Sequence, residues 1–137
     1  MSWLALALLT AALWTGWSFV GKIALKSAAP VQAVILFGVA SVVVGVISLL
    51  VAPRTLSWSP GTLWVTALSA TLGGAGLVTF YLALDRGKAS LVAPVIGIYP
   101  AIVALLSVAF LSEHLSAVQA AGVALAVTGV VLVGLGG

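Results

Sequence analysis

Three residues near the start of the chain have the types and the spacing needed to bind a small solute. Trp14, Ser18 and Lys22 are each four positions apart, so on a helix they share one face. An indole ring, a hydroxyl and an ammonium group together form a surface suited to an anionic or carboxylate-bearing solute. The alternative is that Lys22 lies near a helix end and extends its long stem so that the charge reaches water.

A second candidate stretch, LVAPVIGIYPAI, contains Pro94, Tyr99 and Pro100. Each proline removes a backbone donor and frees a carbonyl that a neighbouring helix, water or a local helix adjustment must then satisfy. We predict a bend at the two prolines that lines a substrate cavity and presents the Tyr99 phenol to the solute. A packed kink without a substrate is the alternative.

A third stretch combines glycines with an aromatic pair. Gly73, Gly74 and Gly76 precede Phe80 and Tyr81, and small residues let a neighbouring helix approach closely. We therefore assign the glycines to helix packing. If they instead face a cavity, they leave room for a solute beneath the aromatic pair, with Tyr81 as the substrate-binding residue.

Covalent, redox and metal chemistry find little support in the residues. The chain has no cysteine and a single histidine, His114, which excludes thiolate sites and gives no metal-ligand spacing. Glu113 is adjacent to His114 and would diverge from it on a helix, while Asp85 and Glu113 both lie at the ends of apolar runs. We predict no catalytic residue, no metal, no cofactor and no central carboxylate for a proton relay.

The composition shows what must surround these groups. Of 137 residues, 64% are hydrophobic and 5% are charged, whereas soluble domains carry roughly a quarter charged residues. The net charge of +3 comes from residues that flank apolar runs and form no basic stripe, so we expect no nucleic-acid partner. We expect a lipid bilayer as the chain's main surroundings.

Breaks that contain charges, prolines or hydroxyl residues divide the sequence into five apolar segments of about 20 residues, the length that a bilayer requires. Backbone groups in hydrocarbon must pair within their own segment, which favours helices. The expected fold is an all-α integral membrane bundle, one transmembrane domain over residues 1–137. Its helices are expected at about 3–21, 31–52, 61–84, 89–111 and 117–136.

The basic residues predict the orientation of the bundle. Lys22, Lys26, Arg86 and Lys88 fall on one side of the membrane and Arg54 on the other. Cytoplasmic loops carry the excess of lysine and arginine. We therefore expect a multi-pass protein of the cell (inner) membrane, with its N-terminus outside and its C-terminus in the cytoplasm.

The last segment carries small residues at regular intervals, with Gly122 and Gly129 on one stripe. Such smooth surfaces serve contacts between membrane helices, so we assign it to packing or dimerisation, and Glu113 is a candidate cap for its start. Five spans are an odd number, so a second copy joined directly would insert upside down. The chain thus has the size and parity of one repeat of an inverted-repeat transporter.

Nearly the whole chain resembles the EamA-type repeat of the drug/metabolite transporter superfamily. The resemblance is strongest in the second half, at Ala83, Leu84, Gly87, Ala89, Pro94, Pro100, Glu113, Leu115, Gln119, Gly122 and Gly129. It implies transport of small organic solutes such as amino acids, nucleosides or drugs. By similarity, Trp14, Ser18, Lys22, Tyr81 and Tyr99 with Pro100 would line the cavity.

Members of this superfamily usually join two repeats in one chain, whereas this sequence holds one. We therefore expect a half-transporter that forms a homodimer or pairs with a second half and alternates access to a small-molecule substrate. Unlike the related small multidrug resistance proteins, the chain has no acid in its first helix. The alternatives are a non-transporting accessory or scaffold subunit and a flippase of a lipid-linked substrate.

Overall fold

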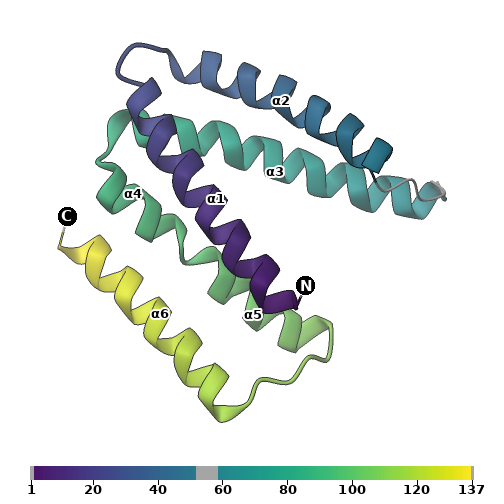
Figure 1. Cartoon of the computed structure of the whole chain (residues 1–137). Coiled ribbons are helices and arrows are strands. Elements are labelled where there is room, and N and C mark those ends of the chain that lie inside the picture. The colour runs from purple at the N-terminus through teal and green to yellow at the C-terminus, as the bar shows by residue number, and fades with distance from the viewer. Residues whose placement is uncertain (1, 52–58, 137) are drawn as a thin grey trace. The chain divides into compact units, whose positions relative to one another are not determined.

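The computed structural model describes residues 2–51 and 59–136, and every regular element in those ranges is a helix (Figure 1). The helices are α1 (Trp3–Ala24), α2 (Pro30–Val51), α3 (Pro60–Arg86), α4 (Ala89–Ile96), α5 (Tyr99–Phe110) and α6 (Ala117–Leu135). Because α4 and α5 are two halves of one span, the described residues contain five segments long and apolar enough to cross a membrane. The predicted all-α bundle of five spans is confirmed.

The first and third helices run further than the sequence predicted. Helix α1 continues to Ala24 and α3 to Arg86, so both include charged residues in their last turns. Basic side chains are favourable there because the carbonyl end of a helix carries partial negative charge. Ala52 and Arg54, which belong to the predicted second span and the loop after it, lie outside the described residues.

Short polar signals fix where the helices begin. The Ser2 hydroxyl accepts the Ala5 N–H at 3.2 Å to start α1, and the Ser116 hydroxyl accepts the Gln119 N–H at 3.3 Å to start α6. The Gln119 side-chain oxygen in turn accepts the Ser116 N–H at 2.8 Å, which completes a capping box. The cap of α6 is therefore this pair, and the expectation that Glu113 caps it was wrong.

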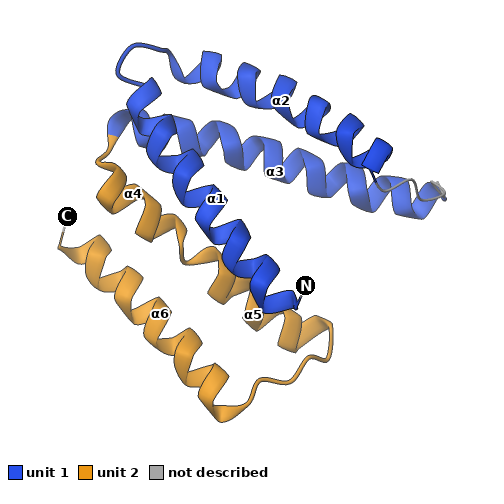
Figure 2. Cartoon of the chain, viewed as in Figure 1, with its two compact units in different colours: residues 1–86 blue, residues 87–137 orange. Residues whose placement is uncertain are grey.

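The chain divides into two compact units, residues 1–86 and residues 87–137 (Figure 2). The first contains α1, α2 and α3, and the second contains α4, α5 and α6. A single domain over the whole chain stays a prediction.

In the first unit, α3 contacts both α2 and α1. Helix α1 crosses α3 near the C-terminal ends of both helices, and their other ends diverge (Figure 1). The buried side chains lie at that crossing: Tyr81 is 4% exposed and Leu84 is fully buried. Helices α1 and α3 are therefore packed most closely at the end that carries Lys22 and Arg86.

In the second unit, α6 contacts both α4 and α5. Ala101 on α5 is 6% exposed, and the half-buried residues of α6 include Val123, Val127 and Val130. These valines recur at three and four positions and so form one helical face. Helix α6 thus packs within its unit through valines.

Most large apolar side chains on these helices are exposed, including Phe110 at 79%, Trp64 at 78% and Val118 at 82%. Water-soluble proteins rarely expose contiguous apolar surface on this scale. Hydrocarbon chains or other apolar helices are the surroundings that such surfaces require.

Candidate functional site

The contact between α1 and α3 is built around Tyr81. Gly21 on α1 has no side chain, and a Cβ placed there would lie 3.3 Å from Tyr81 Cε1. The tyrosine ring therefore fits closely against the α1 backbone, as small residues allow in membrane helices. The Trp17 Nε1–H donates to the Tyr81 hydroxyl at 2.9 Å, so both polar groups of this apolar contact are paired.

Trp17 also lies at the centre of a cluster of aromatic rings that links all three helices of the first unit. Its ring stacks on Phe80 at a centroid distance of 4.7 Å and meets Tyr81 edge-on at 5.8 Å. Phe37 of α2 contributes a tilted ring 5.5 Å from Trp17. Offset and edge-on arrangements are the favourable geometries for such pairs, so this aromatic cluster (Trp17, Phe37, Phe80 and Tyr81) positions α1 and α2 on α3.

Lys22 lies five residues beyond Trp17 on α1, and its ammonium group donates to the Leu84 carbonyl in the last turn of α3. The final carbonyls of a helix have no partner within the helix and carry partial negative charge. A lysine ammonium group supplies both the missing hydrogen-bond donor and a compensating positive charge. The charge of Lys22 is therefore bound to a main-chain group of its own unit.

The packed face of α1 is rotated from the one that the sequence singled out. Trp17, Ser18, Gly21, Lys22 and Leu25 are buried or half-buried, whereas Trp14 is 54% exposed. Of the predicted solute-binding set, the structure brings Lys22 and Tyr81 into the α1–α3 contact. Trp14 stays outside that contact, with its indole accessible.

Sequence reasoning missed Trp17 and Phe37. A signal for Trp17 was present, because Gly21 follows it by one helical turn and offers a gap that a large ring on a neighbouring helix can fill. Nothing in the sequence distinguished Phe37 from the other apolar residues of α2.

The span from Ala89 to Phe110 is interrupted between its two prolines. Helix α4 ends at Ile96 and α5 begins at Tyr99, which leaves Gly97 and Ile98 in a turn. Gly97 is required there, because a Cβ would lie 2.9 Å from the Pro94 carbonyl oxygen. Tyr99 is 46% exposed, so its phenol is accessible beside the interruption, whereas its predicted role in binding a solute stays a prediction.

The glycines assigned to helix packing make no close contact within their own units. A Cβ added at Gly73, Gly74 or Gly76 would meet no atom of the first unit within 4 Å, and the same holds for Gly122 and Gly129 in the second. Their assignment to packing stays a prediction, and it would require a helix that does not contact them within their own unit.

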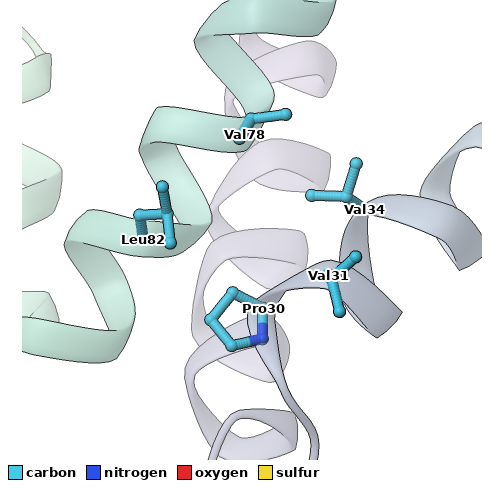
Figure 3. Close-up of a pocket in the computed structure, with 5 residues that line it drawn as sticks. All are labelled: Pro30, Val31, Val34, Val78 and Leu82. Atoms are coloured by element: carbon cyan, nitrogen blue, oxygen red, sulfur yellow. The ribbon is translucent and has the colours of Figure 1, made fainter.

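A small hollow of about 130 Å³ opens between the start of α2 and the last turns of α3 (Figure 3). Its lining is entirely apolar: Pro30, Val31, Val34, Val78 and Leu82. Sites for small molecules usually measure about 300–1,000 Å³ and include a few polar groups that orient the ligand. This hollow lacks both properties.

No group of three or more histidine, cysteine, aspartate or glutamate side chains within residues 2–51 and 59–136 is arranged to hold a metal ion. The chemistry that the described side chains do offer is aromatic contact, hydrogen bonding and the positive charge of lysine and arginine.

Comparisons with known proteins place part of the chain beside one curated relative. A 68-residue stretch, half of this chain and half of the relative, is 41% identical to an uncharacterised protein of Methanocaldococcus jannaschii. The similarity thus spans about half the length of that curated relative. No solved structure matches the chain.

The family comparison covers almost the entire sequence. The model of the EamA-like transporter family matches residues 1–135, which include all five apolar spans and both prolines of the interrupted span. A bilayer is the environment that these spans require. The chain is therefore a multi-pass membrane protein and belongs to the EamA-like transporter family.

Proposed function

We propose that this chain is one half of a transporter that moves a small organic solute across the membrane by alternating access. Family membership over residues 1–135 supports transport as the class of activity. The observation that carries the rest of the proposal is the interrupted span. A helix broken between α4 and α5 offers main-chain groups and a point of bending within the membrane, and such discontinuous helices form the substrate sites of many transporters.

The number of spans and the open glycine faces support pairing with a second half. Five spans make one repeat, and inverted-repeat transporters enclose their sites between two. The open surface at Gly73, Gly74, Gly76, Gly122 and Gly129 gives close-approach positions for a second half. In this proposal, helices of the two halves meet at those glycines.

Trp14, Ser18 and Tyr99 are the side chains proposed to contact the solute. Trp14 and Tyr99 are exposed, so each can contact a solute without first leaving a packed face, and Ser18 is half-buried at the edge of the packed face of α1. Tyr81 and Lys22 are proposed to act mainly as positioning residues, because their polar groups hold α1 on α3.

Transport is tested with purified protein in liposomes loaded with a mixture of labelled metabolites and cationic, anionic and neutral drugs. We expect at least one solute to equilibrate faster than in empty liposomes, and Trp14→Ala or Tyr99→Ala to slow it at least tenfold. Phe110→Ala is the matched control, since Phe110 is 79% exposed and lies at the end of α5. If no solute moves across the whole panel, the transport function is overturned.

The accessory-subunit alternative makes a different prediction for the same preparation. An accessory or scaffold chain would copurify with one membrane protein at fixed stoichiometry and would tolerate Tyr99→Ala. Mass measurement of the detergent-solubilised protein separates a pair of halves from such a complex.

A further inference from the structure

The apolar hollow between α2 and α3 lies close to one end of the first unit (Figure 3). Its lining on α2 consists of the first residues of that helix: Pro30, Val31 and Val34. On α3 it is lined by Val78 and Leu82, and the helix ends at Arg86. At about 1.5 Å of rise per residue, these two side chains lie about 6–12 Å before the end of α3.

The hollow suits hydrocarbon better than water or a polar solute. Every lining residue is apolar, and an apolar cavity of about 150 Å³ stays dry and accepts a benzene-sized group. Val31, Val78 and Leu82 are all exposed, so the hollow is open at the surface of the first unit. In a bilayer, the hydrocarbon that reaches such a surface is the acyl chain of a lipid.

A basic side chain continues the α3 side of the hollow toward the helix end. Val78, Leu82 and Arg86 follow one another at intervals of four residues, so they lie along one face of the helix. Arg86 is exposed and lies one turn beyond the hollow on that face. A guanidinium group is suited to bind the oxygens of a phosphate in a bidentate manner.

The connection between α1 and α2 brings a second charge to the same end of the unit. Before it, Lys22 donates to the Leu84 carbonyl, and after it, Pro30 lines the hollow. Both ends of the connection therefore lie beside the last turns of α3. Lys26 belongs to this connection and is exposed, so its ammonium group is held at the end of the unit that carries Arg86.

The charge at this end is positive overall. Asp85 is the one acidic side chain among the described residues of the first unit. Three basic side chains lie at the same end: Lys22, Lys26 and Arg86. Basic residues beside membrane spans attract anionic lipid headgroups, and basic pockets between spans bind them.

We propose that this end of the first unit binds one anionic phospholipid of the bilayer. One acyl chain fills the hollow, and the phosphate binds Arg86 and Lys26. A phospholipid joins its chains to its phosphate through glycerol, which matches an apolar hollow with charges about one helical turn beyond it. A free anion would leave the hollow unfilled, and a zwitterionic lipid would not neutralise the positive charge. Binding of the lipid does not depend on the transport function proposed above.

Thermal unfolding of the purified protein, washed free of lipid in an uncharged detergent, tests the site. Circular dichroism follows the helices after addition of dioleoylphosphatidylglycerol, dioleoylphosphatidylcholine or inorganic phosphate. The two lipids have the same chains and differ in the charge of the headgroup, whereas inorganic phosphate has the charge without the chains. A ligand that binds only the folded state raises the unfolding midpoint with the logarithm of its concentration.

We expect phosphatidylglycerol to raise the midpoint at concentrations at least tenfold lower than phosphatidylcholine requires, and inorganic phosphate to leave the midpoint unchanged. Native mass spectrometry should show one phosphatidylglycerol retained by each chain. Equal responses to the two lipids, or a midpoint raised as much by inorganic phosphate as by phosphatidylglycerol, would overturn the proposal. So would a midpoint that none of the three changes, because another apolar helix would then be what covers the hollow.

Variants of the basic residues locate the headgroup. Arg86→Gln combined with Lys26→Gln should abolish the tenfold preference for phosphatidylglycerol over phosphatidylcholine. Arg86→Lys keeps the charge and should retain most of that preference. If the double variant prefers phosphatidylglycerol as strongly as the wild-type protein does, the phosphate does not bind at this end of the unit.

A variant of the hollow locates the acyl chain. Val31→Phe places an aromatic ring at the hollow and should weaken the binding of both lipids at least tenfold. Val42→Phe is the matched control, because Val42 lies about three turns further along the same face of α2, is also exposed and does not line the hollow. Equal lipid binding by these two variants would show that the hollow does not hold the chain.

Discussion

At the scale of single residues, the Tyr81 hydroxyl is the acceptor that joins α1 to α3 through the Trp17 indole. Tyr81→Phe keeps the ring in place but leaves the Trp17 N–H without its acceptor. We expect the free energy of unfolding in detergent to fall by about 1–3 kcal/mol, the cost of leaving one buried donor unpaired. Thermal unfolding followed by circular dichroism measures the change.

Tyr99→Phe is the matched control, because Tyr99 is 46% exposed and its hydroxyl makes no hydrogen bond to the described residues. It should change the stability by less than about 0.5 kcal/mol, as surface substitutions usually do. Equal losses in the two variants would mean that the Trp17–Tyr81 bond does not hold the helices together.

Lys22 gives a second prediction at this scale, because it separates a positioning role from a solute-binding role. Lys22→Met removes the charge-assisted bond to the Leu84 carbonyl, and we expect a loss of about 1.5–3 kcal/mol. Lys26→Met, in the exposed segment after α1, should have little effect on the unfolding midpoint. A Lys22→Met protein that keeps its stability but loses transport would show that the ammonium group serves the solute instead.

The face of α1 that the sequence singled out for binding a solute is not the face that packs. The predicted face contains Trp14, Ser18 and Lys22, and the packed face is centred on Trp17, Gly21 and Leu25. The two faces are less than a third of a turn apart, and both are mainly apolar. When lipid surrounds a helix, hydropathy does not distinguish its packed face from its exposed one. The packed face is instead determined by steric fit, here the gap at Gly21 that the Tyr81 ring fills. Such a fit cannot be predicted without knowing which helix is the neighbour.

At the scale of helices, the fit of Gly21 against Tyr81 predicts how closely α1 can approach α3. Gly21→Val would place a branched side chain where a single Cβ already lies 3.3 Å from the tyrosine ring. We expect a loss of about 1–3 kcal/mol from the overpacked contact, together with a weaker Trp17–Tyr81 hydrogen bond. The unfolding midpoint and the shift of Trp fluorescence report these two effects.

Gly16→Val on the same helix is the control, because a Cβ there meets no atom within 4 Å. Both substitutions carry the same change in helix propensity, so their difference isolates the contact with Tyr81. If Gly16→Val destabilises the protein as much as Gly21→Val does, the loss comes from the backbone and not from packing.

The interrupted span shows what an element's sequence can and cannot reveal. Two prolines six residues apart predicted a disturbance, since each removes a donor from the helix ladder. The place of the interruption was not predicted, because it depends on Gly97, the residue between them that tolerates a carbonyl oxygen 2.9 Å from where its Cβ would lie. A pattern of prolines alone allows a smooth kink equally well.

At the scale of the whole molecule, the five spans could be predicted because hydrocarbon permits few backbone arrangements. An apolar run of about 20 residues in lipid must be helical, since only a helix pairs every backbone group within its own segment. The contacts between spans could not be predicted in the same way. The sequence of a helix such as α2, Pro30–Val51, is apolar on all sides, so it indicates no face from which a neighbour could be inferred.

Orientation in the membrane is the last property that the chain's charges predict. Lys22 lies in the last turn of α1 and Lys26 follows that helix, while Arg86 ends α3 and Lys88 follows it. Alternate connections of a multi-span protein share one side of the membrane, so these four basic residues lie on the same side. Because cytoplasmic loops carry the excess of basic residues, we expect the N-terminus outside and the C-terminus in the cytoplasm. The chain has no cysteine, so single cysteines introduced as Ser2→Cys and Gly136→Cys can be labelled with a membrane-impermeant maleimide.

In intact cells Ser2→Cys should react with the maleimide, and Gly136→Cys should react only after the membrane is opened.

The basic residues can be tested directly by replacing Lys26 and Lys88 with glutamine. Both side chains are exposed, so the change lowers the number of basic residues on that side without altering the α1–α3 contact. Part of the protein should then insert in the opposite orientation. Equal labelling of both ends in the unmodified background would contradict a single orientation and would make an inverted homodimer the expected pair. If one orientation dominates, the same chain cannot supply both halves of an inverted pair, and the pairing proposed above would then need a parallel copy or a separate half that inserts in the opposite sense.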